Sequence, residues 1–144
     1  MAIQSDGKIV VAGDTTDGSA LARYADKGEL DPTFDGDGKV TGSAGEANDL
    51  SGGFDTATTS SSTPGAASWS SAARPAPPSP DMAVVRDLPG GKLDSTFGAG
   101  VTADFHGFGE RGHDVGTDAA GRIVAAGSTL GPSGDEFALM RVNP

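Results

Sequence analysis

The chain has 144 residues, ten basic against twenty acidic, and no Cys, so it carries a net charge of −10 and cannot form disulfides, zinc–thiolate sites or thiol nucleophiles. This acidity disfavours nucleic acid and anionic membranes as partners, and neither a membrane span nor a secretory signal peptide is visible. Leu, Ile, Val and Phe supply only 25 residues, while Gly and Pro supply 32, which favours disorder or a turn-rich fold over a large apolar core.

The first part of the chain predicts short β-strands between tight turns. Residues 8–13 form a β-branched run flanked by Asp and Gly, and residues 20–24 form a second apolar run after a polar turn. Residues 28–34, Gly-Glu-Leu-Asp-Pro-Thr-Phe, then lead through glycines into Val40. Strands this short, separated by turns, predict a meander of antiparallel strands and not helices.

Three aspartates in this region, Asp31, Asp35 and Asp37, are candidates for binding calcium. Several carboxylates on a glycine-bent turn are ligands that calcium prefers. The full spacing of a calcium loop with its distal Glu is absent, and the matching place in the next repeat, residues 98–100, has no carboxylate. We interpret the three as a solvated turn, with a calcium site as the alternative and no other cofactor expected.

Tandem repetition is the strongest signal in the sequence. Units of this kind cannot bury an apolar face alone and therefore stack into solenoids or propellers. The matching blocks are 5–13 with 119–127 (an offset of 114, twice 57), 19–24 with 81–86 and 136–141, and 28–34 with 91–97. The resulting divisions are unit 1 (1–43), an aberrant segment (44–80), the remainder of unit 2 (81–103) and a partial unit 3 (104–144).

The aberrant segment does not fit the repeat. Between residues 51 and 80, 26 of 30 residues are Ser, Thr, Gly, Ala or Pro, a composition typical of a flexible linker.

The repeat spacing nevertheless places a strand block near residues 64–70. Reading the gene in a shifted frame, with TCN serine codons, converts this stretch into a Val-rich run with a Gly in the expected place. We interpret it as a frameshifted start of unit 2, with a genuine linker as the alternative. Resequencing the gene over residues 50–82 separates the two.

An arginine recurs at the same place in each unit. Arg23, Arg86 and Arg141 each lie in an apolar strand, and Asp31 and Asp94 follow the first two after eight residues. Because a buried guanidinium needs a charged partner, we predict a structural Arg–Asp ion pair within the units and not a ligand site.

Two histidines, His106 and His113, lie near aspartates and could bind a metal or act as acid and base. Neither recurs in unit 1, and the chain lacks the H-E-x-x-H, G-x-S-x-G and phosphate-loop motifs. We interpret both as surface residues, so the sequence nominates no catalytic residue.

The blocks Asp-Gly-Lys-Ile-Val-Val-Ala-Gly (6–13), Ala-Leu-Ala-Arg-Tyr (20–24) and Leu-Asp-Pro-Thr-Phe (30–34) resemble the bacterial delta-60 repeat, a family found in long arrays and assigned to β-propellers. The resemblance implies an all-β fold of two to three incomplete propeller-type blades, a location at the cell surface or outside the cell, and no known catalytic residue.

Closed propellers need about four to eight blades, so we expect a fragment of a longer array, or a chain that associates with itself through open blade edges. The first functional hypothesis is a non-catalytic scaffold that presents loops to a protein or glycan partner. The alternative is a fragment of a propeller enzyme, of the lyase or glycoside hydrolase type, with carboxylates lining the channel.

Overall fold

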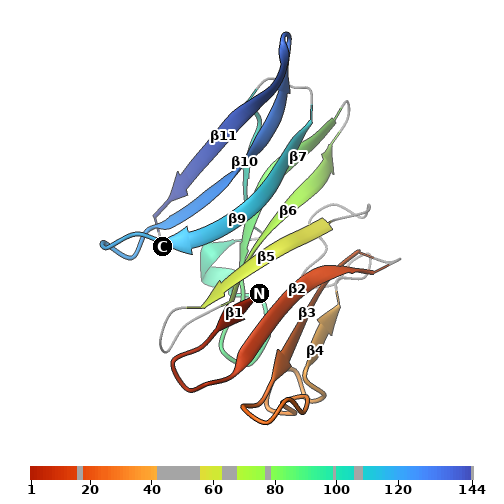
Figure 1. Cartoon of the computed structure of the whole chain (residues 1–144), viewed down its shortest axis with the longest axis vertical. Helices are drawn as coiled ribbons and strands as arrows, with labels where there is room; N and C mark the ends of the chain where they lie inside the picture. The colour runs from red at the N-terminus through yellow and green to blue at the C-terminus, as the bar shows by residue number, and fades with distance from the viewer. Residues whose placement is uncertain are drawn as a thin grey trace.

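The computed structural model of the chain describes residues 1–15, 18–41, 56–62, 68–76, 79–98, 100–105 and 109–143. These residues form three antiparallel sheets, which Figure 1 shows in chain order from the bottom of the molecule to the top. Within the described ranges the helical structure is one short 3-10 turn, η1 (Ser95–Phe97), and no helix there has the length and apolar character needed to cross a bilayer. The predicted all-β architecture of incomplete blades is confirmed.

The sheet of unit 1 is a meander. Its strands, in both spatial and sequence order, are β1 (Ala2–Ile3), β2 (Ile9–Thr15), β3 (Gly18–Tyr24) and β4 (Lys39–Thr41). Gly7, at φ 82°, lies in the turn between β1 and β2, where a positive φ favours glycine. Val10, Leu21 and Val40 from three different strands pack with Phe34, and this cluster is the core of unit 1.

The sheet of unit 2 includes part of the aberrant segment. Its strands are β5 (Thr56–Ser62), β6 (Ser68–Ala76), β7 (Ser79–Arg86) and β8 (Val101–Ala103), in that spatial order. β6 pairs with β7 as β2 pairs with β3 in unit 1. Most of the strand block expected near residues 64–70 lies outside the described residues, and β6 begins at Ser68, at the end of that block.

Unit 3 supplies the third sheet, in the order β11-β10-β9. Its strands are β9 (Glu110–Thr117), β10 (Ile123–Gly131) and β11 (Gly134–Val142). Burial alternates along β10, because one face of the strand packs against unit 2. The largest core cluster lies between these two units and comprises Met82, Val84, Val115, Ile123, Ala125, Ala138 and Met140.

The first strand of unit 2, β5, lies against both neighbouring sheets. β5 contacts both β1 and β9, and Figure 1 shows β5 between β2 and β9. Each sheet thus packs against the next one along the chain, which is consistent with incomplete blades of a propeller-type fold.

A β-bulge in unit 3 depends on a glycine. The register of β9 and β10 shifts between Ala126 and Gly127, and a Cβ added at Gly127 would lie 1.9 Å from the carbonyl oxygen of Arg111. We expect Gly127→Ala to lower the free energy of unfolding by roughly 3 kcal/mol, because the backbone must move to relieve this clash. Urea denaturation followed by circular dichroism measures the change. Gly116→Ala in β9 is the control, since its Cβ meets nothing within 4 Å; equal losses in the two variants would contradict the explanation.

Candidate functional site

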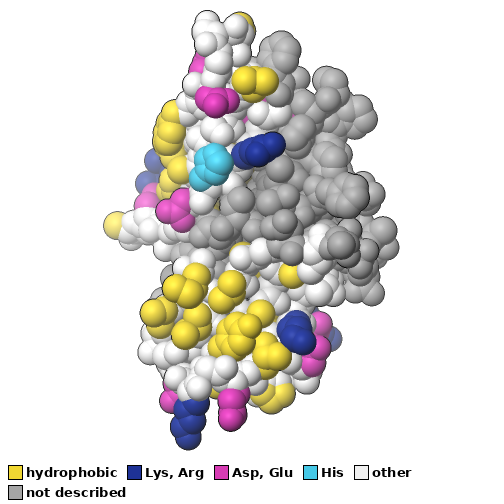
Figure 2. Space-filling model, turned by 45° about the vertical axis from the view of Figure 1, so that its right-hand side comes forward, with side chains coloured by type: hydrophobic (Ala, Val, Ile, Leu, Met, Phe, Trp, Pro, Cys, Tyr) yellow, Lys and Arg dark blue, Asp and Glu magenta, His cyan; other side chains and the backbone are white. Residues whose placement is uncertain are grey.

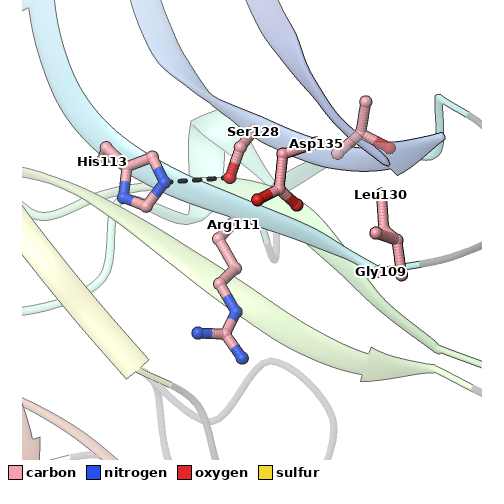
Figure 3. Close-up of a pocket in the computed structure, with 7 residues that line it drawn as sticks. Gly109, Arg111, His113, Ser128, Leu130 and Asp135 are labelled. Carbon is pink, nitrogen blue, oxygen red and sulfur yellow. Dashed lines mark hydrogen bonds between the residues drawn. The ribbon is translucent and has the colours of Figure 1, made fainter. Parts of the chain in front are cut away.

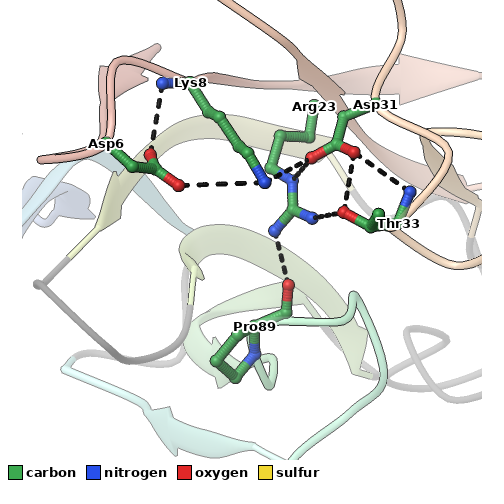
Figure 4. Close-up of polar contacts among 6 residues, drawn as sticks. All are labelled: Asp6, Lys8, Arg23, Asp31, Thr33 and Pro89. Atoms are coloured by element: carbon green, nitrogen blue, oxygen red, sulfur yellow. Dashed lines mark hydrogen bonds and ion pairs between the residues drawn. The ribbon is translucent and has the colours of Figure 1, made fainter.

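The sequence-predicted residues Arg23 and Asp31 meet at a buried site in unit 1. Arg23 Nε donates to Asp31 Oδ2 over 2.7 Å, and both residues are about 5% exposed. Arg23 Nη2 donates to the hydroxyl of Thr33, which in turn donates to Asp31 Oδ1 over 2.7 Å. The guanidinium carbon lies 4.7 Å from the centroid of the Phe34 ring, a cation–π contact. Figure 4 shows the polar contacts of this arrangement.

Unit 2 repeats the same geometry. Arg86 Nε forms an ion pair with Asp94 Oδ2 over 2.7 Å, and Arg86 Nη2 donates to the hydroxyl of Thr96. The hydroxyl of Thr96 donates to Asp94 Oδ1 over 2.6 Å, and the guanidinium lies 4.8 Å from the ring of Phe97. We call each set an Arg–Asp clamp: Arg23, Asp31, Thr33 and Phe34 in unit 1, and Arg86, Asp94, Thr96 and Phe97 in unit 2. Arg141, the third recurring arginine, is exposed.

The clamps hold their carboxyl groups ionised. The hydroxyl of Thr33, together with Lys8, the backbone N–H of Thr33 and the charge of Arg23, holds the pKa of Asp31 well below its usual range. The hydroxyl of Thr96 is likewise the main cause of a lowered pKa at Asp94. Each clamp carboxylate is therefore ionised and already accepts hydrogen bonds from neighbouring groups.

The clamp of unit 1 also contacts unit 2. Arg23 Nη1 donates to the carbonyl oxygen of Pro89, in the turn after β7 (Figure 4). The backbone N–H of Asp35 donates to the carbonyl of Gly90 over 2.8 Å. A Cβ at Gly91, which has a φ of 87°, would lie 2.9 Å from Val40. This turn therefore packs closely against unit 1, and the guanidinium joins the two units.

The three aspartates that the sequence offers for calcium do not share one site. The carboxylate of Asp31 faces Arg23 and Lys8, whose Nζ lies 2.9 Å away. Asp37 accepts from the backbone N–H of Lys39, and both Asp35 and Asp37 are exposed. Among the described residues, the carboxylates close enough to share one ion are a different set: Asp81, Asp104 and Glu110.

A shallow hollow of about 470 Å³ lies on the sheet of unit 3. Figure 3 shows His113 of β9 pointing toward Ser128 of β10, and His113 Nε2 lies 2.9 Å from the Ser128 hydroxyl. Arg111 and Asp135 also line this hollow. A serine nucleophile needs a base that a third group orients, and in the described part of the chain no carboxylate accepts a hydrogen bond from His113. His106 lies outside the described residues.

Some residues at these sites were not singled out from the sequence. Thr33 and Thr96, and Phe34 and Phe97, recur at the same places after each clamp aspartate, so the repeat comparison carries a signal for them. Glu110 and Asp87 are both buried without recurring in unit 1, and sequence offers no comparable signal for their burial.

Comparison with known proteins covers part of unit 1. Residues 4–34 match a family model described as a domain of unknown function (DUF5122) beta-propeller. No curated protein and no solved structure matches the chain. The matched residues include β2, β3 and all four members of the first Arg–Asp clamp. Over unit 1, the chain is therefore similar to a β-propeller repeat family of unknown function.

Proposed function

We propose that the chain is a non-catalytic propeller-type scaffold whose two outer faces bind further units of the same repeat, and whose loops are presented to a protein or glycan partner. The observation that carries the proposal is a difference in burial between equivalent residues. Leu21 and Val84 are 4% and 0% exposed, whereas Leu139, at the same place in unit 3, is 53% exposed. Phe137 is 75% exposed, and its counterpart Met82 is fully buried. Unit 3 therefore exposes the apolar face that unit 2 buries against its neighbour.

Unit 1 exposes the face that corresponds to the one that unit 3 buries against unit 2. Ala125 of unit 3 is fully buried against unit 2, but its counterpart Val11 is 37% exposed and nearby Ile3 is 69% exposed. Figure 2 shows hydrophobic side chains gathered over the lower part of the molecule, where unit 1 lies. The faces of unit 1 and unit 3 are thus the two sides of one blade-to-blade contact, which supports head-to-tail association between copies of this chain.

The experiment is light scattering after size-exclusion chromatography at several concentrations. We expect the chain to exceed its monomer mass of 14.2 kDa increasingly as concentration rises. Phe137→Ser with Leu139→Ser removes the unit 3 face, and Val11→Asp disables the unit 1 face, so each variant alone is expected to be monomeric. Leu88→Ser, an exposed apolar residue in the turn after β7, is the control and retains association.

Mixing the two interface variants tests the geometry. Each retains one intact face, so the mixture is expected to form dimers and nothing larger. A wild-type chain that stays monomeric at every concentration contradicts the proposal. Self-association of the Val11 variant alone would show that two unit 3 faces meet each other, and would contradict the head-to-tail arrangement.

A further inference from the structure

Three carboxylates from two units converge at one place. Asp81 lies in β7 of unit 2, whereas Asp104 directly follows β8 at the start of unit 3, and Glu110 begins β9 of the same unit. One carboxylate oxygen from each lies within 4.8 Å of those of the other two. The pairing of Met82 with Ala103 in β7 and β8 brings Asp81 and Asp104 opposite each other as the ladder continues.

The burial of Glu110 distinguishes this cluster from a group of acidic residues on the surface. Its side chain is 0% exposed. Oε1 accepts a hydrogen bond from the Thr129 hydroxyl over 2.8 Å, whereas Oε2 is buried without a hydrogen-bond partner. Burial of a carboxylate oxygen without a hydrogen-bond donor or a cation beside it lowers the stability of the fold.

The spacing of the oxygens fits calcium. Oxygens bound to one calcium ion at about 2.3–2.6 Å lie at most about 5 Å apart, so oxygens within 4.8 Å of one another can share it; calcium also accepts irregular geometry, whereas magnesium requires a nearly ideal octahedron. Burial ranges from Glu110, which is buried, to Asp104, which is exposed, so an ion can enter from solvent and retain water ligands. Three carboxylates supply the hard anionic oxygens that calcium prefers.

We propose that Asp81, Asp104 and Glu110 bind a calcium ion that joins unit 2 to unit 3. The ion meets the buried Oε2 of Glu110 and takes further oxygen ligands from Asp81 and Asp104. The competing explanation is that other groups of the chain already neutralise the cluster, since Asp81 and Asp104 each have further contacts within it. That explanation predicts no binding of calcium. The site lies within one chain, so its test does not depend on the head-to-tail association proposed above.

The test is calorimetric titration of calcium into the full chain after treatment with a chelator, together with thermal unfolding. We expect one calcium ion per chain, a rise in melting temperature with calcium, and weaker binding of magnesium. Glu110→Gln keeps the side chain's size but removes its charge, and is expected to weaken calcium binding at least about tenfold. Asp104→Asn, at the exposed end of the cluster, should weaken binding without disturbing the core.

The control is the double variant Asp35→Asn with Asp37→Asn, which alters the other candidate calcium residues and should leave binding unchanged. Two results would overturn the proposal. One is the absence of both binding heat and thermal stabilisation at millimolar calcium. The other is calcium binding that persists in both Glu110→Gln and Asp104→Asn but is lost in the Asp35 and Asp37 variant.

Discussion

Arg23→Met is expected to lower the free energy of unfolding by about 3 kcal/mol, because it leaves the carboxylate of Asp31 buried without its guanidinium. Arg23 and Asp31 have side chains that are each 6% exposed, so solvent cannot replace the lost partner. The variant also loses the donor to the Pro89 carbonyl, which joins unit 1 to unit 2. Lys8 remains near Asp31 and limits the loss. Urea denaturation of wild type and variant at neutral pH measures the difference.

Two matched variants show whether the clamp explains this loss. Arg86→Met removes the equivalent ion pair, threonine contact and aromatic contact in unit 2, where the side chains of Arg86 and Asp94 are 17% and 11% exposed, so a smaller loss is expected there. Arg23→Lys keeps the charge but cannot reach Asp31, Thr33 and Pro89 together, and should lie between wild type and Arg23→Met.

A double-mutant cycle gives the coupling between the two partners. We expect Arg23→Met combined with Asp31→Asn to cost less than the sum of the single changes, because the second change removes the unpaired charge. Strictly additive losses would mean that the two side chains do not stabilise each other, and the clamp would then not be the structural element that its geometry suggests.

Repetition within the sequence accounts for much of what could be predicted. Two clamp arginines and two aspartates recur at equal spacing, and the structure brings each pair to 2.7 Å. The strands of unit 1 follow from alternating apolar runs and glycine turns. Each of these features depends on neighbouring residues within one unit, so local pattern and repeat spacing contain the necessary information.

What could not be predicted depends on contacts between units. Val84 and Leu139 occupy the same place in the repeat, yet one is buried and the other is 53% exposed, because only the first has a following unit packed on it. The carboxylates of Asp81 and Glu110 are far apart in sequence and meet only when units 2 and 3 pack together. Likewise Gly13 and Gly127 match in the repeat, but only Gly127 lies against backbone.

Asp87 is a buried charge at a place where the other units carry Tyr24 and Val142. It follows β7, forms a bridge with Leu93 and is 0% exposed. Neither carboxylate oxygen accepts a hydrogen bond from a described residue. Burial raises the pKa of Asp87 from 3.8 to about 7. Unlike the clamp aspartates, Asp87 therefore costs stability when it is ionised.

The consequence is a stability that falls as pH rises. Between pH 3.8 and about 7 the folded chain holds the Asp87 proton more tightly than the unfolded chain, so the free energy of unfolding decreases across this window. The full penalty, on the order of 4 kcal/mol, is present above about pH 7. Asp31 and Asp94 have lowered pKa values, so above about pH 5 they are ionised in both states and add no slope there.

Asp87→Val installs the residue that unit 3 carries, and it is expected to stabilise the chain most at alkaline pH. At pH 8 the variant should exceed wild type by roughly 2–4 kcal/mol, and at pH 4 the difference should be clearly smaller, because protonation has removed the charge from wild type and only the cost of burying an unpaired neutral carboxyl remains. Asp87→Asn separates charge from polarity: it should lose the pH slope but gain less stability, since a buried amide still lacks partners. Urea denaturation at pH 4, 6 and 8 provides the comparison. If the free energies of unfolding of wild type and Asp87→Val differ by the same amount at all three pH values, the charge of Asp87 is neutralised by a partner in the folded chain. Burial of the charge would then carry no electrostatic cost.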